Sequence, residues 1–210
     1  MYASIVFYLW TIMPATITRS KPVPDFLIYE VLDGNNIYYK NYEEVTDNGK
    51  TLEEIMASSI LQSTLITIIL KFLFKQINDK EYFIASNEAG LHIAKGNNLA
   101  NDIAIYSKTK HRIDHFSRNY FDFPPETVIE IDIKADIRDF VSPMDYIYKK
   151  TKKMHDFGVK TVIWITTESR LITLATPDAP ITTYDWDENV KLFDDCIINI
   201  NTLLKEEGII

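Results

Sequence analysis

Two carboxylates and an ammonium group alternate along one short apolar stretch of the chain. Residues 127–134 read TVIEIDIK, a run that is typical of a β-strand. Because side chains alternate between the two faces of a strand, we expect Glu130, Asp132 and Lys134 on one face and isoleucines on the other. Charged groups inside a fold are costly unless they are paired or bind a metal. This strand alone is equally compatible with a structural ion pair on a solvated sheet face.

Asp102 favours a functional interpretation of these charges. It stands at the head of another apolar run, DIAIY, shortly before the acidic strand. Two neighbouring strands would bring Asp102 beside Glu130 and Asp132. Carboxylate oxygens are preferred ligands of Mg²⁺, which can activate water and stabilise charge on a phosphate. A nearby lysine can stabilise the same transition state. The residue types therefore predict metal-assisted hydrolysis of a phosphodiester bond.

The elements that must position these residues predict one mixed α/β domain. Asp33 to Asn36 form a turn signal between two strand-like runs. Thr51 and Glu54 match a capping box at the start of a helix that would continue through residues 55–74. Ser142 and Pro143 begin a second helix, which Gly158 ends. Further strands are expected at residues 81–85, 90–94, 102–106, 160–166 and 170–176, and a closing helix, or a strand and a helix, at 189–207.

Length, charge and cysteine content narrow the class of protein. With 210 residues the chain has room for one sizeable domain. A net charge of −8 argues against a protein that coats nucleic acid through a global basic field, but not against a nuclease whose carboxylates hold a metal. The single cysteine excludes an intrachain disulfide and suits a reducing cytosol, so we expect a cytoplasmic location. Gln62 and Lys71 interrupt the apolar helix, which favours packing in the core over a membrane span.

The first residues form an apolar stretch that is too short to cross a bilayer and lacks a positive segment before it. Met13 opens a more polar, proline-rich run. We therefore expect translation to begin at Met13, with residues 1–12 absent from the native protein. Residues 1–24 would form an N-terminal extension and residues 25–210 a single domain.

Four segments of the chain resemble, in their order and spacing, the PD-(D/E)XK nuclease superfamily, and more specifically the Uma-type restriction endonuclease family of bacteria. The joint match is fairly specific, although each piece alone is weak. The resemblance implies a restriction-endonuclease-like core, a mixed β-sheet flanked by helices. The matching segments are YEVLDG at 29–34, NDIAIY at 101–106, VIEIDIKAD at 128–136 and KTKKMHDFGVKTVIWI at 150–165.

The resemblance also implies which positions carry the site. Recurrent acidic residues fall on Glu30, Asp102 and Glu130, and a recurrent basic residue falls on Lys150. Two positions depart from the family pattern. Asn101 replaces the usual proline before the first aspartate, and a histidine near the start of the long helix is absent around Leu61 or Gln62.

The register of the motif leaves two assignments open. Aligned on Glu130, the motif lysine would fall on Asp132. Read literally, the motif takes Asp132 as the acid and Lys134 as the lysine. Lys150, from the following helix, could replace the motif lysine. We expect Asp102, Glu130 and Asp132 to bind Mg²⁺ or Mn²⁺, with Lys134 or Lys150 positioning the water.

The predicted function is therefore a Mg²⁺-dependent endodeoxyribonuclease, a hydrolase that cleaves phosphodiester bonds of nucleic acid. DNA is the expected partner, a homodimer is considered, and no membrane association is expected. Two alternatives stay open. One is a catalytically inactive nucleic-acid-binding protein on the same fold. The other is a regulatory protein without a nucleic-acid role, which the acidic net charge supports best.

Overall fold

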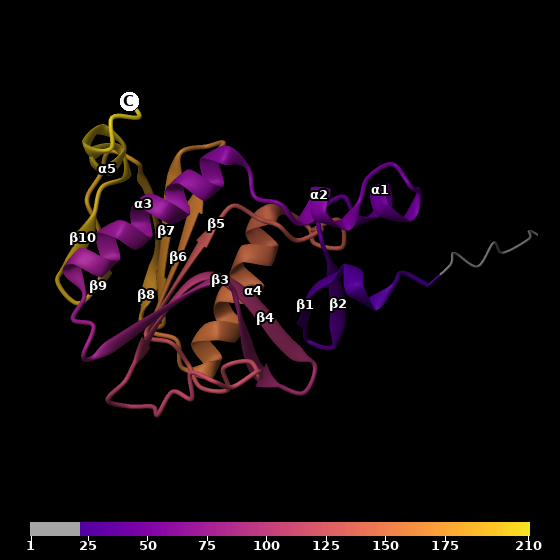
Figure 1. The fold of residues 1–210 in the computed structure, drawn as a ribbon, viewed down its shortest axis with the longest axis horizontal. Coiled ribbons are helices and arrows are strands. Elements are labelled where there is room, and N and C mark those ends of the chain that lie inside the picture. Colours follow the sequence, from indigo (N-terminus) through magenta and orange to yellow (C-terminus); the bar gives the residue numbers. More distant parts are fainter. Residues whose placement is uncertain (1–21) are drawn as a thin grey trace, which may run out of the picture.

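An eight-stranded mixed sheet forms the centre of the structure, a computed structural model that describes residues 22–210 (Figure 1). Its strand order is β2-β1-β4-β5-β6-β7-β8, and β3 also pairs with β4. Only β5 and β6 run parallel. A separate two-stranded sheet contains β9 and β10. The strands are β1 Ile28–Leu32, β2 Asn35–Tyr38, β3 Tyr82–Ala94, β4 Asn97–Ser107, β5 Thr127–Ile131, β6 Thr161–Thr166, β7 Leu171–Thr176, β8 Ala179–Asp185, β9 Val190–Phe193 and β10 Cys196–Ile198.

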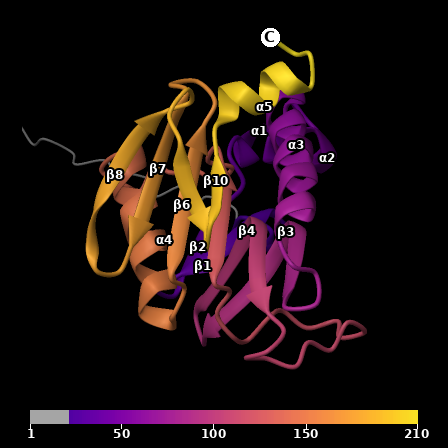
Figure 2. The same ribbon diagram turned by 90° about the vertical axis from the view of Figure 1, so that its left-hand side faces the viewer.

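Helices cover both faces of the large sheet (Figure 2). On one face, α3 packs against isoleucines of β4, β5 and β6, joined by α5. On the other face, α4 packs against valines of β5 and β6. The central strand β5 is buried along its whole length, as expected for a strand covered on both sides. The helices are η1 Asp25–Leu27, α1 Tyr42–Thr46, α2 Leu52–Met56, α3 Ile60–Gln76, α4 Pro143–Phe157 and α5 Ile200–Glu206.

Local capping chemistry sets the limits of α4, the helix that covers the candidate site. Ser142 accepts a hydrogen bond from the Asp145 backbone N–H at 3.2 Å, and Pro143 occupies the first helical position. Gly158 ends the helix in a left-handed conformation with a φ of 117°, which glycine adopts without a side-chain clash. The predicted boundaries of this helix are confirmed.

The long helix predicted from Thr51 is wrong in one respect, because it is two helices. The capping box of Thr51 and Glu54 is present, but α2 ends at Met56. Ala57 has an extended backbone, and Ser59 then caps α3 by accepting a hydrogen bond from the Gln62 N–H at 3.1 Å. No helix in residues 22–210 is both long and apolar enough to cross a membrane.

Two strand predictions also need correction. The expected strands at 81–85 and 90–94 are one strand, β3, with a register shift between Ser86 and Ala89. The expected strand at 127–134 ends at Ile131, because Asp132 adopts a φ of 59° that breaks the extended backbone.

The closing segment predicted at 189–207 contains two short strands and a helix. The predicted extension at 1–24 and its start at Met13 fall almost wholly on residues outside those described. The division into this extension and a single domain at 25–210 stays a prediction.

Candidate active site

Asp102 and Glu130 lie on adjacent strands at the centre of the sheet. β4 pairs antiparallel with β5 and Ile103 faces Ile129, so the next pair along the register is Asp102 and Glu130. Directly opposed residues share a sheet face. Here it is the face covered by α4, since the neighbouring isoleucines belong to the opposite core. Asp102 also accepts a hydrogen bond from the Ile131 N–H at 2.8 Å through Oδ2. Both carboxyl groups are buried.

Lys150 lies between two buried carboxylates, those of Glu30 and Glu130. We call these three residues the Lys150 triad. The Lys150 Nζ lies 3.1 Å from Glu30 Oε2 and 3.0 Å from Glu130 Oε1. It also donates a hydrogen bond to the Ala100 carbonyl at 2.8 Å. Lys150 is only 1% exposed. The hydroxyl of Tyr146 donates to the other oxygen of Glu30. The sheet and α4 therefore hold this lysine completely inside the protein.

The charge inside the Lys150 triad is only partly neutralised. Burial is the main cause that raises the pKa of Glu130 to about 8; the Lys150 ammonium group opposes this rise, and the charges of Asp102 and Glu30 contribute to it. Burial alone would lower the pKa of Lys150, but Glu130 and Glu30 raise it above its ordinary value. Within residues 22–210, Glu130 Oε1 has no aligned hydrogen-bond donor despite its ion pair. Glu130 is thus a buried acid that lacks full compensation.

Lys134 bridges a second pair of carboxylates, and we call Glu88, Lys134 and Asp102 the Lys134 triad. Its Nζ lies 2.8 Å from Glu88 Oε1 and 3.3 Å from Asp102 Oδ1. Burial alone would lower the pKa of Lys134, yet Asp102 and Glu88 together raise it above its ordinary value. The side chain of Lys134 is 15% exposed. The two triads meet at the paired strands that carry Asp102 and Glu130.

The Lys134 triad lines a cavity of about 500 Å³ between the sheet and the start of α3. Asp102 and Lys134 therefore border an open space, whereas Glu130 and Lys150 are buried and do not line it. The remaining lining residues come from the end of α2, the turn after it, α3 and β3: Met56, Ser58, Ser63, Ile66, Thr67, Ser86 and Asn87.

Asp132 does not join these carboxylates, so the expected shared face of Glu130, Asp132 and Lys134 is wrong. After β5 ends, the Asp132 carboxylate turns to Thr167 at the start of the β6–β7 turn. It accepts one hydrogen bond from the Thr167 N–H and another from the Thr167 hydroxyl, both at 2.7 Å. Asp132 thus ties two loops together, and Lys134 reaches Asp102 from the irregular segment that follows β5.

Two polar residues near the site were not predicted. Glu88 falls in the break between the strands expected at 81–85 and 90–94, but nothing in the sequence marks it as a site residue. Gln62 does carry a signal, as a polar residue in an apolar helix. It is buried and donates a hydrogen bond from Nε2 to the Ile131 carbonyl at 2.7 Å. It stands near the position where the resemblance implies a histidine.

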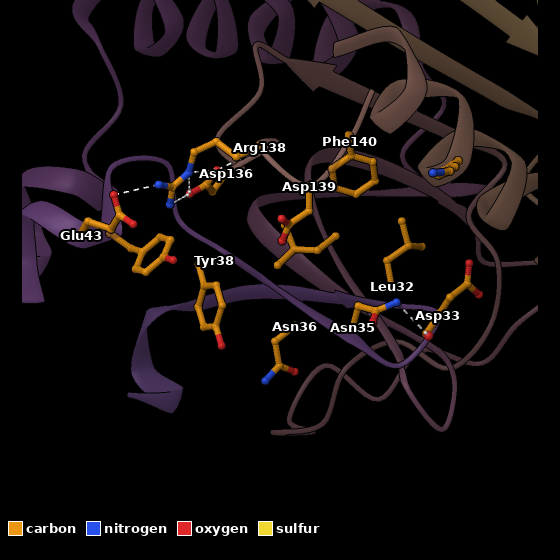
Figure 3. Close-up of a pocket in the computed structure, with 13 residues that line it drawn as sticks. Leu32, Asp33, Asn35, Asn36, Tyr38, Glu43, Asp136, Arg138, Asp139 and Phe140 are labelled. Atoms are coloured by element: carbon orange, nitrogen blue, oxygen red, sulfur yellow. Dashed lines mark hydrogen bonds and ion pairs between the residues drawn. The ribbon is translucent and has the colours of Figure 1, made fainter. Parts of the chain in front are cut away.

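A larger cavity of about 690 Å³ lies over the β1–β2 hairpin, away from the triads (Figure 3). Arg138 occupies one side of it, where its guanidinium contacts the carboxylates of Asp136 and Glu43 and lies over the Tyr42 ring. None of the six predicted site residues lines this cavity. The smaller cavity is lined by two of the predicted site residues, Asp102 and Lys134, so it is the better candidate for the reacting centre.

The residues beside the smaller cavity suit a divalent cation with few protein ligands. The ion pairs link four carboxylates with only two ammonium groups, which leaves excess negative charge. Mg²⁺ commonly binds through one or two carboxylates and keeps several waters. Asp102 and Glu130 match that mode. A denser site is absent, since the described part of the chain has no group of three or more His, Cys, Asp or Glu residues that could hold a metal.

Comparison with known proteins supports the fold. Neither a protein-family model nor a curated protein matches the chain. Among solved structures, it is similar to a protein from Anabaena variabilis that is described as a candidate nuclease belonging to DUF820. The TM-score is 0.58 at 14% sequence identity, and the match covers 84% of this chain and 89% of that one. The chain therefore has the predicted fold class, a mixed α/β fold in which helices flank the sheet, and shares this fold with that structure.

Proposed function

We propose that this protein is a divalent-metal-dependent endonuclease that hydrolyses phosphodiester bonds of nucleic acid. One observation carries the proposal. Asp102 and Glu130 occupy opposed positions on two central strands, Asp102 lines a cavity, and the four carboxyl groups of the two triads share only two ammonium groups. The likeness in fold to a candidate nuclease points in the same direction.

Asp102 and Glu130 are the residues that would hold Mg²⁺ or Mn²⁺. A bound cation of this kind lowers the pKa of water and neutralises charge on a phosphate. It would also supply the positive charge that Glu130 lacks in its buried position. Asp132 is not proposed as a ligand, because Thr167 occupies both of its carboxylate oxygens.

The two lysines would act at different distances from the substrate. Lys134 lines the cavity beside Asp102, where its ammonium group can orient a water molecule and stabilise negative charge on the phosphate. Lys150 lies below and fixes the carboxylate of Glu130 through a direct ion pair. Glu30, in turn, holds Lys150 from the opposite side. We therefore favour Lys134 as the lysine of the reaction.

DNA is the proposed substrate, with the cytoplasm as the place of action. A net charge of −8 gives the protein no global attraction for a polyanion. Binding would depend on local cations and on the metal at Asp102. A homodimer would set two such sites on one duplex, which is how a single active site per chain could cut both strands.

A catalytically inactive nucleic-acid-binding or regulatory protein on the same fold is the second candidate. One observation favours it. Each carboxylate of the two triads already contacts a lysine, and residues 22–210 contain no three-residue metal site. On this alternative, the triads would be structural ion pairs.

Cleavage of circular and linear DNA in Mg²⁺, Mn²⁺ or EDTA separates these candidates. We expect both DNA forms to be cut with either metal and to stay intact in EDTA. Asp102→Asn should remove the activity, while Asp187→Asn, at an exposed aspartate outside the site, should keep it. Salt-dependent retardation of DNA without cleavage would favour the inactive binding protein. Neither binding nor cleavage would favour the regulatory protein.

A further inference from the structure

The bulge in β3 holds two consecutive residues in the left-handed region of backbone space. Asn87 has a φ of 66° and Glu88 a φ of 55°. Between Ser86 and Ala89 the strand advances three residues while its partner β4 advances two, so β3 contains one extra residue. Residues other than glycine rarely adopt this conformation, and such strain persists only where the surrounding structure enforces it. Bulges of this kind re-aim side chains next to active sites.

The bulge directs Glu88 toward the mouth of the candidate site. Glu88 lines the same cavity as Asp102 and Lys134. Its Oε1 lies 2.8 Å from the Lys134 Nζ, and its Oε2 accepts a hydrogen bond from the Tyr39 hydroxyl at 3.4 Å. The ammonium group of Lys134 is therefore held between Glu88 on one side and Asp102 on the other.

Lys134 needs such a restraint more than Lys150 does. Lys150 projects from the middle of α4 into a fully buried position. Lys134 lies on an irregular segment, three residues beyond the end of β5, where the Lys40 N–H donates to its carbonyl at 2.7 Å. A lysine side chain has four flexible bonds and no fixed geometry of its own. Its ammonium position therefore depends on the acids that contact it.

We propose that Glu88 is a positioning residue that holds the Lys134 ammonium group beside Asp102, and that the bulge serves to place Glu88 there. This inference rests on the proposed function and adds a residue to its site. Glu88 acts through Lys134, and its loss should slow the chemical step more than it weakens substrate binding.

A double-mutant cycle on single-turnover cleavage tests the proposal. At saturating enzyme, Glu88→Gln should lower the rate about tenfold, because a misplaced charge acts poorly on the transition state, while the dissociation constant for DNA stays within about twofold. In a Lys134→Ala background, Glu88→Gln should have no further effect on the rate. A wild-type rate in Glu88→Gln, or an equal loss in both backgrounds, would overturn the inference.

Two further measurements separate positioning from folding and from the function itself. Glu206→Gln makes the same change at an exposed glutamate of α5 away from the cavity, so it should retain the wild-type rate; a tenfold loss in it as well would overturn the inference. The same cycle on unfolding by urea should show coupling between Glu88 and Lys134, and its absence would overturn the inference whether or not DNA is cut. A wild-type protein that never cuts DNA would instead overturn the proposed function, and with it the positioning role of Glu88 in that reaction.

Discussion

The two lysine triads have the same composition and opposite surroundings. Each places one ammonium group between two carboxylates within 3.3 Å. In the Lys150 triad the lysine is 1% exposed and also bonds a backbone carbonyl. In the Lys134 triad the lysine side chain is 15% exposed and borders a cavity. On the proposed function, burial divides similar charges between holding the site together and acting on the substrate.

This difference in burial bears on the choice between Lys134 and Lys150 as the lysine of the motif. The Lys150 triad fixes the geometry of Glu130 from inside the fold, where a buried ion pair broken on one side is strongly destabilising. The Lys134 triad holds Asp102 at the border of a cavity. We expect the first triad to control stability and the second to control turnover.

Lys150→Met should give the largest effect on stability. It leaves Glu30 and Glu130 buried without their shared cation, and breaking a buried ion pair costs about 3–5 kcal/mol. Urea denaturation would measure the loss. Lys149→Met is the matched control on the same helix, since its exposed pair with Asp145 should contribute less than about 1 kcal/mol. Equal losses in the two variants would contradict the role of the Lys150 triad.

Lys134→Ala should reduce turnover about a hundredfold, equivalent to about 3 kcal/mol of transition-state stabilisation. The reason is its place beside Asp102 at the cavity. Single-turnover cleavage at saturating enzyme would measure it, and the free energy of unfolding should change far less than in Lys150→Met. Lys191→Ala, at an exposed lysine on β9, serves as the control. If Lys134→Ala lost DNA affinity but kept its turnover, the lysine would be a binding contact only.

Stability should fall as pH rises, because Glu130 keeps a proton in the folded state. Its pKa of about 8 in the folded protein lies above the ordinary value of 4.5. The contribution of Glu130 to the free energy of unfolding is therefore greatest below pH 4.5, and it is lost as the pH rises to 8. Within this window the contribution of Glu130 should decline by about 1.4 kcal/mol per pH unit. Glu130→Gln should therefore match wild type near pH 5 and exceed it at pH 8, in EDTA.

Comparing wild type with Glu130→Gln removes the effect of other acids whose pKa values are lowered by folding. Glu126 and Asp136 have lowered pKa values and lose stability as pH falls, but they do so equally in both. Parallel stability curves for wild type and Glu130→Gln from pH 5 to 8 would show that Glu130 is charged throughout.

The sequence predicted the parts of the site that regular structure positions. Strand alternation and pairing brought Asp102 beside Glu130, and capping signals located α4, which carries Lys150. It failed where the backbone leaves regular structure. Asp132 ends β5 with a positive φ, so the alternation did not extend to Lys134. The approach of Lys134 to Asp102 depends on long-range packing that no local pattern encodes.

The same limit explains the bulge and the helix break. Asn87 adopts a positive φ that asparagine tolerates, and the sequence predicted a break between two strands there, but no local signal predicts the positive φ of Glu88 or the continuation of the strand beyond it. The apolar periodicity after Thr51 continued across Ala57, where the chain turns and Ser59 begins a new helix. The spacing of apolar residues indicates which side of a helix faces the core, but it locates the ends of the helix poorly.

Asp132→Asn should give the smallest effect of this series. Asparagine tolerates a left-handed backbone and keeps one acceptor for the Thr167 N–H. We expect a loss of about 1 kcal/mol in the free energy of unfolding, from the weakened hydrogen bonds to Thr167. Urea denaturation would measure it, and a loss above about 3 kcal/mol would mean that Asp132 supports more than one loop.

The central claim is that Asp102 belongs to the reacting centre and Asp132 does not. Single-turnover cleavage of DNA in Mn²⁺ by Asp102→Asn and Asp132→Asn tests it directly, because the two substitutions are chemically identical. Asp102→Asn should slow cleavage at least about a hundredfold, and Asp132→Asn should stay within about threefold of wild type. Full activity in Asp102→Asn, or a comparable loss in Asp132→Asn, would contradict the assignment of the site.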